Sequence, residues 1–389
     1  MFSHRTNWHR EHNRLSELLE SRRASRKPIY DLTVSNPTEC NFSYPQQEIL
    51  TALSDVNALY YHPHPRGLFS ARKAVAEYYS VKGKSVHPEN IFLTASTSEA
   101  CSLILKLLCN AGEGVLVPLP SYPLFEYLAK INDVDLQHYH LTYDHGWQID
   151  IESITRAIKP STKAIVIVNP HNPTGMFLKN DECKHIQGIA RRHDLALIVD
   201  EVFLDYPFDD DTARLGTTAG KSNVLTFTLN GISKMMGLPQ MKLGWIAVGG
   251  PHQQVTEACE RFEILCDIFL SVNTPVQVAL PTFLIHGKTI QSQILNCTKS
   301  NYNYLKNSLL NTPCSLLSAE GGWYAVLQVP NTRSEEELAI GLLSECGIYL
   351  FPGYFFDFQN EGYLVVSLLT QPEVFEPAIN NLVRHISTR

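Results

Sequence analysis

The sequence predicts an α/β protein in which a mostly parallel sheet is wrapped by helices and joined to a smaller α+β domain. Residues 164–168 and 195–199 are entirely apolar, and a strand of that kind is covered on both faces. From Asn90 onward, strand-like and helix-like segments alternate, as they do around parallel sheets. After about Pro275 the alternation stops, and this change marks the second domain.

The size and composition of the chain fit this architecture. With 389 residues the chain is too long for one small core. A hydrophobic content of 44% and a charged content of 18% are those of a soluble globular protein. We expect residues 1–48 to form an N-terminal arm that belongs to the small domain, 49–285 the large domain, and 286–389 the small C-terminal domain.

The charge and the cysteines restrict the partners and the compartment. A net charge of −7 argues against a nucleic-acid or anionic-membrane partner. No secretory core follows the initial methionine, and no apolar stretch is long enough to cross a bilayer. The nine cysteines contain no C-x-x-C pair, which indicates free thiols in a reducing compartment. We therefore expect a cytoplasmic protein, without a metal site because no metal-ligand spacing occurs.

The first ninety residues contain an amphipathic helix, expected over 8–25, and two loops with functional potential. Residues 35–38 (SNPT) form a turn that exposes backbone N–H groups, so Asn36 lies either in a plain loop or in one that faces substrate.

Proline and glycine hold residues 60–67 extended before a helix that starts at Phe69. Such an arm either crosses a subunit interface or packs on its own chain.

An anion site is expected at the start of the next helix. A short apolar strand at 91–94 is followed by Ser96, Thr97 and Ser98. Hydroxyls and free N–H groups at a helix start bind a phosphate well, although simple helix capping also explains these residues.

Polar and aromatic side chains follow several predicted strands. Tyr122 comes after the strand at 114–118, and Asn172 and Asp200 come after the two apolar strands. Ligands bind at the carboxyl ends of parallel strands, so we expect these side chains to lie together.

Lys234 stands between two further apolar runs, 224–229 and 243–248, in a glycine-containing turn. A lysine held there is poorly solvated, which suits an amine kept available as a Schiff-base nucleophile. The alternative is an ordinary loop lysine beside two strands.

The smaller domain is expected to combine three strand-like runs with long helices. One helix reaches His286 and is stopped by Gly287. The remaining elements are strands within 321–330, 347–358 and 362–369, and helices at about 290–310 and 374–386.

Together these residues satisfy the requirements of pyridoxal phosphate. That cofactor needs a Schiff-base lysine, a phosphate site, a carboxylate for the pyridine nitrogen and an aromatic face for the ring. The residues that suit these roles, with an amide for the ring hydroxyl, are Lys234, the Ser96–Thr97–Ser98 group, Asp200, Tyr122 and Asn172. Once substrate displaces it, the Lys234 amine can also move a proton between the substrate α-carbon and the cofactor.

Several motifs resemble those of the class I/II aminotransferases, which are fold-type I pyridoxal-phosphate enzymes. NPHNPTG (169–175), IVDEVF (198–203) and GISKMMGLPQMKLGW (231–245) occur in the family's order, over nearly the whole chain. PSYP carries the stacking aromatic, Tyr122. YHPHPRGL (61–68) resembles the arm whose tyrosine, here Tyr61, touches the phosphate of the neighbouring subunit's cofactor. The resemblance implies a homodimer that transfers an amino group between an amino acid and a 2-oxo acid.

Three positions depart from the family pattern. Phe203 replaces a tyrosine that bonds the ring oxygen, which predicts a raised pKa for the Schiff base. Lys242 replaces the phosphate-binding arginine and is a less directional anchor. Val365 stands where the family has the arginine that clamps the substrate carboxylate, so another group holds that carboxylate or the substrate lacks one.

These departures keep other activities open. A C–S lyase or a decarboxylase would use the same cofactor and the same scaffold. A degenerate cofactor-binding protein is a third option, against which Lys234, Asp200 and Asn172 argue. A nicotinamide dehydrogenase is disfavoured because no G-x-G-x-x-G follows a first strand.

Overall fold

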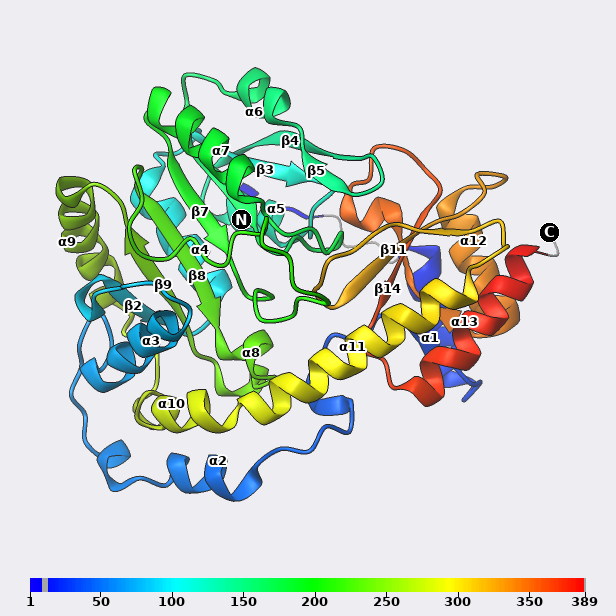
Figure 1. Cartoon of the computed structure of the whole chain (residues 1–389), viewed down its shortest axis with the longest axis horizontal. Coiled ribbons are helices and arrows are strands. Elements are labelled where there is room, and N and C mark those ends of the chain that lie inside the picture. Colours follow the sequence, from blue (N-terminus) through cyan, green and yellow to red (C-terminus); the bar gives the residue numbers. More distant parts are fainter. Residues whose placement is uncertain (9–12, 388–389) are drawn as a thin grey trace.

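The computed structural model describes residues 1–8 and 13–387 (Figure 1). The α-helices are α1 (Arg14–Ala24), α2 (Gln46–Leu53), α3 (Phe69–Val81), α4 (Thr97–Leu108), α5 (Leu124–Ile131), α6 (Ile151–Ala157), α7 (Asn180–Arg192), α8 (Ile232–Met235), α9 (His252–Phe269), α10 (Thr274–His286), α11 (Lys288–Ser308), α12 (Glu335–Gly341) and α13 (Pro372–Ser387). The strands are β1 (Tyr30–Asp31), β2 (Ile91–Thr94), β3 (Gly114–Leu119), β4 (Asp135–Tyr143), β5 (Trp147–Ile149), β6 (Thr162–Val168), β7 (Ala196–Asp200), β8 (Thr226–Gly231), β9 (Gly244–Gly249), β10 (Ser315–Leu316), β11 (Tyr324–Gln328), β12 (Ile348–Tyr349), β13 (Phe351–Pro352) and β14 (Tyr363–Ser367).

An eight-stranded sheet forms the centre of the large domain, in the order β2-β9-β8-β7-β6-β3-β4-β5. The strands from β8 to β4 pair in parallel, whereas β9 and β5 run antiparallel to their neighbours. The predicted mostly parallel sheet is therefore confirmed. The carboxyl ends of β6, β7 and β8 meet at one edge, which is where the polar side chains were expected.

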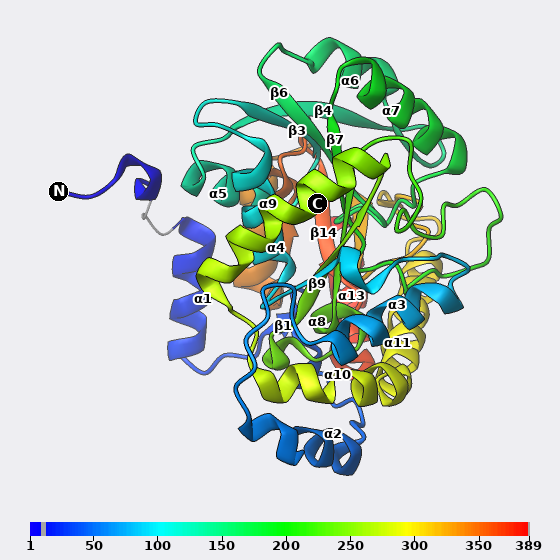
Figure 2. The same ribbon diagram turned by 90° about the vertical axis from the view of Figure 1, so that its left-hand side faces the viewer.

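Helices cover both faces of this sheet (Figures 1 and 2). Along β7 the side chains alternate: Ala196 and Ile198 join a core with α4, α5 and α9, while Leu197 and Val199 join a core with α3, α6, α7 and α10. This two-sided burial explains why the strand is apolar at every position.

The small domain is built on an antiparallel sheet of order β10-β11-β14-β13. Its core includes residues of α1, α12 and α13, and β1 pairs in parallel with β12. Helix α1 and strand β1 therefore pack with the C-terminal elements, whereas Cys40 is already part of the core of the large domain. Helix α11 links the two domains, because Ile294 is buried in the large core and Leu305 in the small one.

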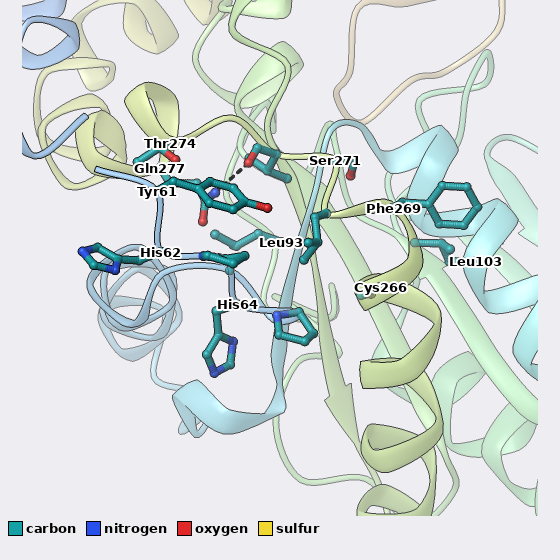
Figure 3. Close-up of a pocket in the computed structure, with 15 residues that line it drawn as sticks. Tyr61, His62, His64, Leu93, Leu103, Cys266, Phe269, Ser271, Thr274 and Gln277 are labelled. Carbon is teal, nitrogen blue, oxygen red and sulfur yellow. Dashed lines mark hydrogen bonds between the residues drawn. The ribbon is translucent and has the colours of Figure 1, made fainter. Parts of the chain in front are cut away.

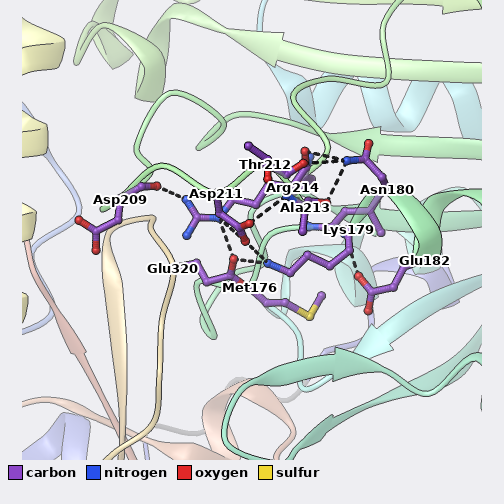
Figure 4. Close-up of polar contacts among 12 residues, drawn as sticks. Met176, Lys179, Asn180, Glu182, Asp209, Asp211, Thr212, Ala213, Arg214 and Glu320 are labelled. Carbon is purple, nitrogen blue, oxygen red and sulfur yellow. Dashed lines mark hydrogen bonds and ion pairs between the residues drawn. The ribbon is translucent and has the colours of Figure 1, made fainter.

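Ion pairs of Glu320 connect the loop before β11 to the large domain (Figure 4). The Glu320 carboxylate accepts hydrogen bonds from Lys179 and from Arg214 Nε, the latter at 2.7 Å. The next residue, Gly321, forms a backbone bridge with Pro207. This bridge fixes where the chain enters β11.

The first helix begins later than its sequence pattern predicts. We expected a helix over 8–25, but α1 starts at Arg14, and residues 9–12 lie outside the described part of the chain. Asn13 explains the start, since its side-chain oxygen caps the helix by accepting the Ser16 N–H at 2.8 Å.

Within residues 1–8 and 13–387, no helix has both the length and the apolar character that a membrane crossing requires. All nine cysteines are free thiols.

Candidate active site

A solvent-connected cavity opens at the carboxyl edge of the large sheet. Eight of the predicted site residues line it: Ser96, Thr97, Ser98, Tyr122, Asn172, Asp200, Lys234 and Lys242. They come from the ends of β2, β3, β6, β7 and β8 and from the loop before β9. The convergence expected from the strand ends is therefore present in the structure.

Lys234 lies in α8, a single turn of helix that begins directly after β8. Its Nζ is 3.3 Å from the Ser35 carbonyl oxygen and 5.0 Å from the centre of the Trp323 ring. Burial lowers the pKa of this amine to about 8, although the nearby Asp200 carboxylate opposes the shift. A larger neutral fraction makes Lys234 a better nucleophile near neutral pH than an ordinary lysine.

Asp200 is the last residue of β7 and faces the same cavity. Burial raises the pKa of its carboxyl group to about 6, and the Val202 N–H and the Lys234 ammonium oppose that shift. The Val202 N–H donates to Asp200 Oδ1 at 3.0 Å, which fixes the orientation of the carboxylate. A carboxylate held in this way can pair with a buried cationic ring nitrogen.

The residues at the N-terminus of α4 line the cavity. Ser96 caps the helix by accepting the Glu99 N–H at 3.1 Å, and the Glu99 carboxylate accepts the Ala95 N–H at 2.6 Å. The backbone of Gly244 packs closely on this helix start, because a Cβ there would come within 3.2 Å of the Thr97 nitrogen. Helix capping is therefore present in this segment, and the capping residues also line the cavity.

Asn172 and Tyr122 complete the walls around Asp200. Within the described part of the chain, the buried Asn172 Oδ1 has no hydrogen-bond partner, so this oxygen can accept a hydrogen bond from a ligand. The Tyr122 ring is 42% exposed and lies 6.4 Å from the Phe356 ring. An exposed aromatic face at the cavity can stack on a flat ligand.

The three residues that depart from the family pattern lie in different surroundings. Phe203 lines the cavity and packs edge-on against Trp323, with 5.2 Å between ring centres. Lys242 lines it too, with a left-handed backbone at φ 54°. Val365 is completely buried in β14 opposite Val326 and adds no charge to the cavity.

Tyr61 and Asn36 lie outside the cavity. Tyr61 is 74% exposed and lines a separate depression beside α9 and α10, together with Gln277 and Phe269 (Figure 3). Asn36 accepts the Thr38 N–H and donates to Glu39, so its side chain serves a local turn. Its neighbour Ser35 is the residue of this loop that reaches the cavity.

Four site residues were missed by the sequence analysis: Ser35, Tyr206, Trp323 and Tyr324. Tyr206 is buried and donates its hydroxyl to the Lys234 carbonyl oxygen at 2.6 Å, and so supports the backbone of α8. Trp323 and Tyr324 follow a pair of glycines, which was the only local signal that their backbone approaches another segment.

Comparison with known proteins identifies the family to which the sequence is similar. The profile of the family "Aminotransferase class I and II" matches residues 29–382. A glutamate-pyruvate aminotransferase, AlaA, from Haemophilus influenzae is 28% identical over 367 residues, which cover 92% of this chain and 91% of the relative. An alanine aminotransferase from Mycobacterium tuberculosis is 29% identical over 272 residues, or 69% of this chain and 62% of the relative.

Solved structures show the same fold. An aminotransferase from Escherichia coli superimposes with a TM-score of 0.88 at 25% identity, covering 100% of this chain and 98% of its own. An alanine aminotransferase from Pyrococcus furiosus gives 0.90 at 24% identity and covers 100% of both chains.

Proposed function

Because the chain belongs to the class I and II aminotransferase family, we propose that it moves an amino group between an amino acid and a 2-oxo acid through a Schiff base on Lys234. It is an aminotransferase, and the family uses pyridoxal phosphate. One observation carries the proposed roles. The low-pKa amine of Lys234, the Asp200 carboxylate and the N-terminus of α4 line a single cavity.

The residues of the cavity fit this cofactor. The partnerless side-chain oxygen of Asn172 can accept a bond from the ring hydroxyl, and the residues at the N-terminus of α4 line the same cavity. Ser96, Thr97, Ser98 and Lys242 would hold that phosphate. Bound there, pyridoxal phosphate supplies an aldehyde for the lysine and an electron-withdrawing ring.

The remaining roles belong to the protein's own side chains. Asp200 would pair with the positive charge of a protonated ring nitrogen. Tyr122 would stack on the ring and help to exclude water. Lys234, once released by the substrate amine, would accept the proton of the substrate α-carbon and later give it up again.

A homodimer is part of this proposal, because large apolar side chains are exposed on and near helices α2, α9 and α10, whose backbones are seen in Figure 2. Leu50, Leu59, Ile264, Ile268 and Ile285 are each at least 63% exposed there. Monomers rarely leave such large adjoining apolar side chains in water. Pairing through this face would cover them and bring Tyr61 of one subunit toward the phosphate site of the other.

The test is an absorption titration of the purified protein with a panel of amino acids and simple amines. The names of the relatives make alanine and glutamate the first donors to try. We expect the visible Schiff-base band to be replaced by that of the amine form of the cofactor, with release of the matching 2-oxo acid. A band that no donor converts would contradict amino transfer, whereas Lys234→Ala should abolish the band itself.

Val365 favours a second candidate, a C–S lyase or decarboxylase. The described lining of the cavity contains two cations, Lys234 and Lys242, and both are assigned to the cofactor. A substrate carboxylate therefore has no dedicated arginine, which changes how the substrate is oriented. Ammonia with pyruvate, or carbon dioxide, from a donor that leaves the visible band unconverted would establish this reaction instead.

A further inference from the structure

We propose that the indole face of Trp323 and the backbone carbonyl of Ser35 form the resting place of the Lys234 amine whenever that amine has no covalent partner. The inference rests on the proposed function, because a substrate amine is what frees Lys234 from the cofactor. Trp323 is then a catalytic residue, since it touches the group that forms the Schiff base and carries the proton.

The geometry around the amine supports this assignment. Lys234 Nζ lies 5.0 Å from the centre of the Trp323 ring, within the roughly 6 Å over which an ammonium is attracted to an aromatic face. It is also 3.3 Å from the Ser35 carbonyl oxygen, to which it donates. The Trp323 ring is only 1% exposed, so little water competes for its face.

Packing fixes the Trp323 ring in this position. Phe203 and Tyr206 both meet the ring edge-on, with 5.2 and 5.4 Å between the ring centres. Within the described residues the buried indole N–H has no partner, so the aromatic contacts and the backbone set the ring's orientation.

The backbone around Trp323 is tied to the same neighbours. The Gly322 N–H donates to the Tyr206 carbonyl at 2.9 Å, and the Tyr206 hydroxyl donates to the Lys234 carbonyl at 2.6 Å. Tyr206 therefore joins the backbone beside the indole to the backbone of the lysine. The Glu320 contact with Lys179 and Arg214 (Figure 4) holds the same loop from its other side.

The chemistry of a proton carrier explains why such a place is useful. The freed amine must be neutral to accept the substrate proton, and must stay near the reacting atoms after it becomes an ammonium. Burial favours the neutral form, whereas the Asp200 carboxylate, the aromatic face and the Ser35 carbonyl favour the charged one. An aromatic face holds the ammonium more weakly than a carboxylate ion pair would, so the proton can leave again.

The test measures the charge of Lys234 directly in the full-length protein freed of cofactor. Acetic anhydride acylates only neutral amines, so brief labelling between pH 6 and 10, read by mass spectrometry of the Lys234 peptide, gives a titration curve. We expect Trp323→Leu to move the midpoint to lower pH by roughly 0.5 to 1 pH unit. Trp323→Phe keeps a ring and a more conservative core, and should give a smaller shift in the same direction.

Trp147→Leu is the matched control, because Trp147 is another buried indole without an N–H partner among the described residues and lies in β5, away from the cavity. It should leave the Lys234 midpoint in place. A midpoint that stays, rises, or falls equally in the control variant would overturn the proposal. Labelling requires neither cofactor nor substrate, so this result is independent of whether amino transfer is observed.

Discussion

Phe203 lies in the cavity wall where the related enzymes have a tyrosine. A phenol at this position would donate to the ring oxygen of the cofactor and favour the deprotonated Schiff base. We therefore predict that Phe203→Tyr lowers the pKa of the visible Schiff-base band by roughly one pH unit. Spectral pH titrations of both proteins measure this value. Phe2→Tyr, at an exposed position that does not line the cavity, is the control, and equal midpoints in wild type and Phe203→Tyr would refute the effect.

Glu201 is completely buried next to Asp200, and burial raises the pKa of its carboxyl to about 7. The Thr217 hydroxyl and the N–H and hydroxyl of Thr218 donate to it, which limits the rise. The pKa of the Glu201 carboxyl is higher in the folded protein than in the unfolded chain. The protonated carboxyl therefore contributes its full stabilisation below about pH 4.5, and this contribution is lost as the pH rises through about 7.

We predict from this that Glu201→Gln reduces the loss of stability between pH 5 and pH 8, by roughly 3 kcal/mol in the free energy of unfolding. Urea unfolding at both pH values provides the comparison with wild type. An unchanged difference between the two pH values would mean that Glu201 stays ionised in the folded protein.

At the start of helix α4 one residue, Ser96, both caps the helix and is proposed to bind the cofactor phosphate. Ser96→Ala removes its N-cap, which should cost about 1 kcal/mol of stability and also weaken cofactor binding. Ser334→Ala is a matched control, because Ser334 caps α12 by accepting the Glu337 N–H at 3.2 Å in the small domain. It should cost similar stability but leave the cofactor dissociation constant unchanged. Equal effects of the two variants on that constant would exclude a phosphate role for Ser96.

The strand ends of the parallel sheet account for the part of the site that the sequence could predict. Asn172, Asp200 and Lys234 each follow an apolar run, and a parallel sheet brings such ends to one edge. Ser35 and Trp323 carry no comparable signal. Ser35 is placed by the pairing of β1 with β12, and Trp323 by the bridge between Gly321 and Pro207. Both depend on contacts between segments far apart in the chain, which periodicity does not report.

The assembly state is a property of the whole molecule. If the apolar face around α2, α9 and α10 joins two subunits, Ile268→Glu places a charge in a desolvated contact and should shift the protein toward monomers. Light scattering after size-exclusion chromatography determines the mass. Val81→Glu is the control, because Val81 is 81% exposed at the end of α3. Monomers in both variants, or dimers in both, would contradict an interface on this face.

The placement of Ser35 has a consequence for when the protein acquires its site during synthesis. Its loop leaves the ribosome early, but Val34 is held by the hydroxyl of Ser367, and Leu32 accepts the Ser367 N–H at 2.7 Å. Strand β1 likewise cannot pair until β12 has been synthesised. The carbonyl that receives the lysine amine is therefore positioned only after nearly the whole chain has been translated, so an incomplete chain carries Lys234 without its surroundings.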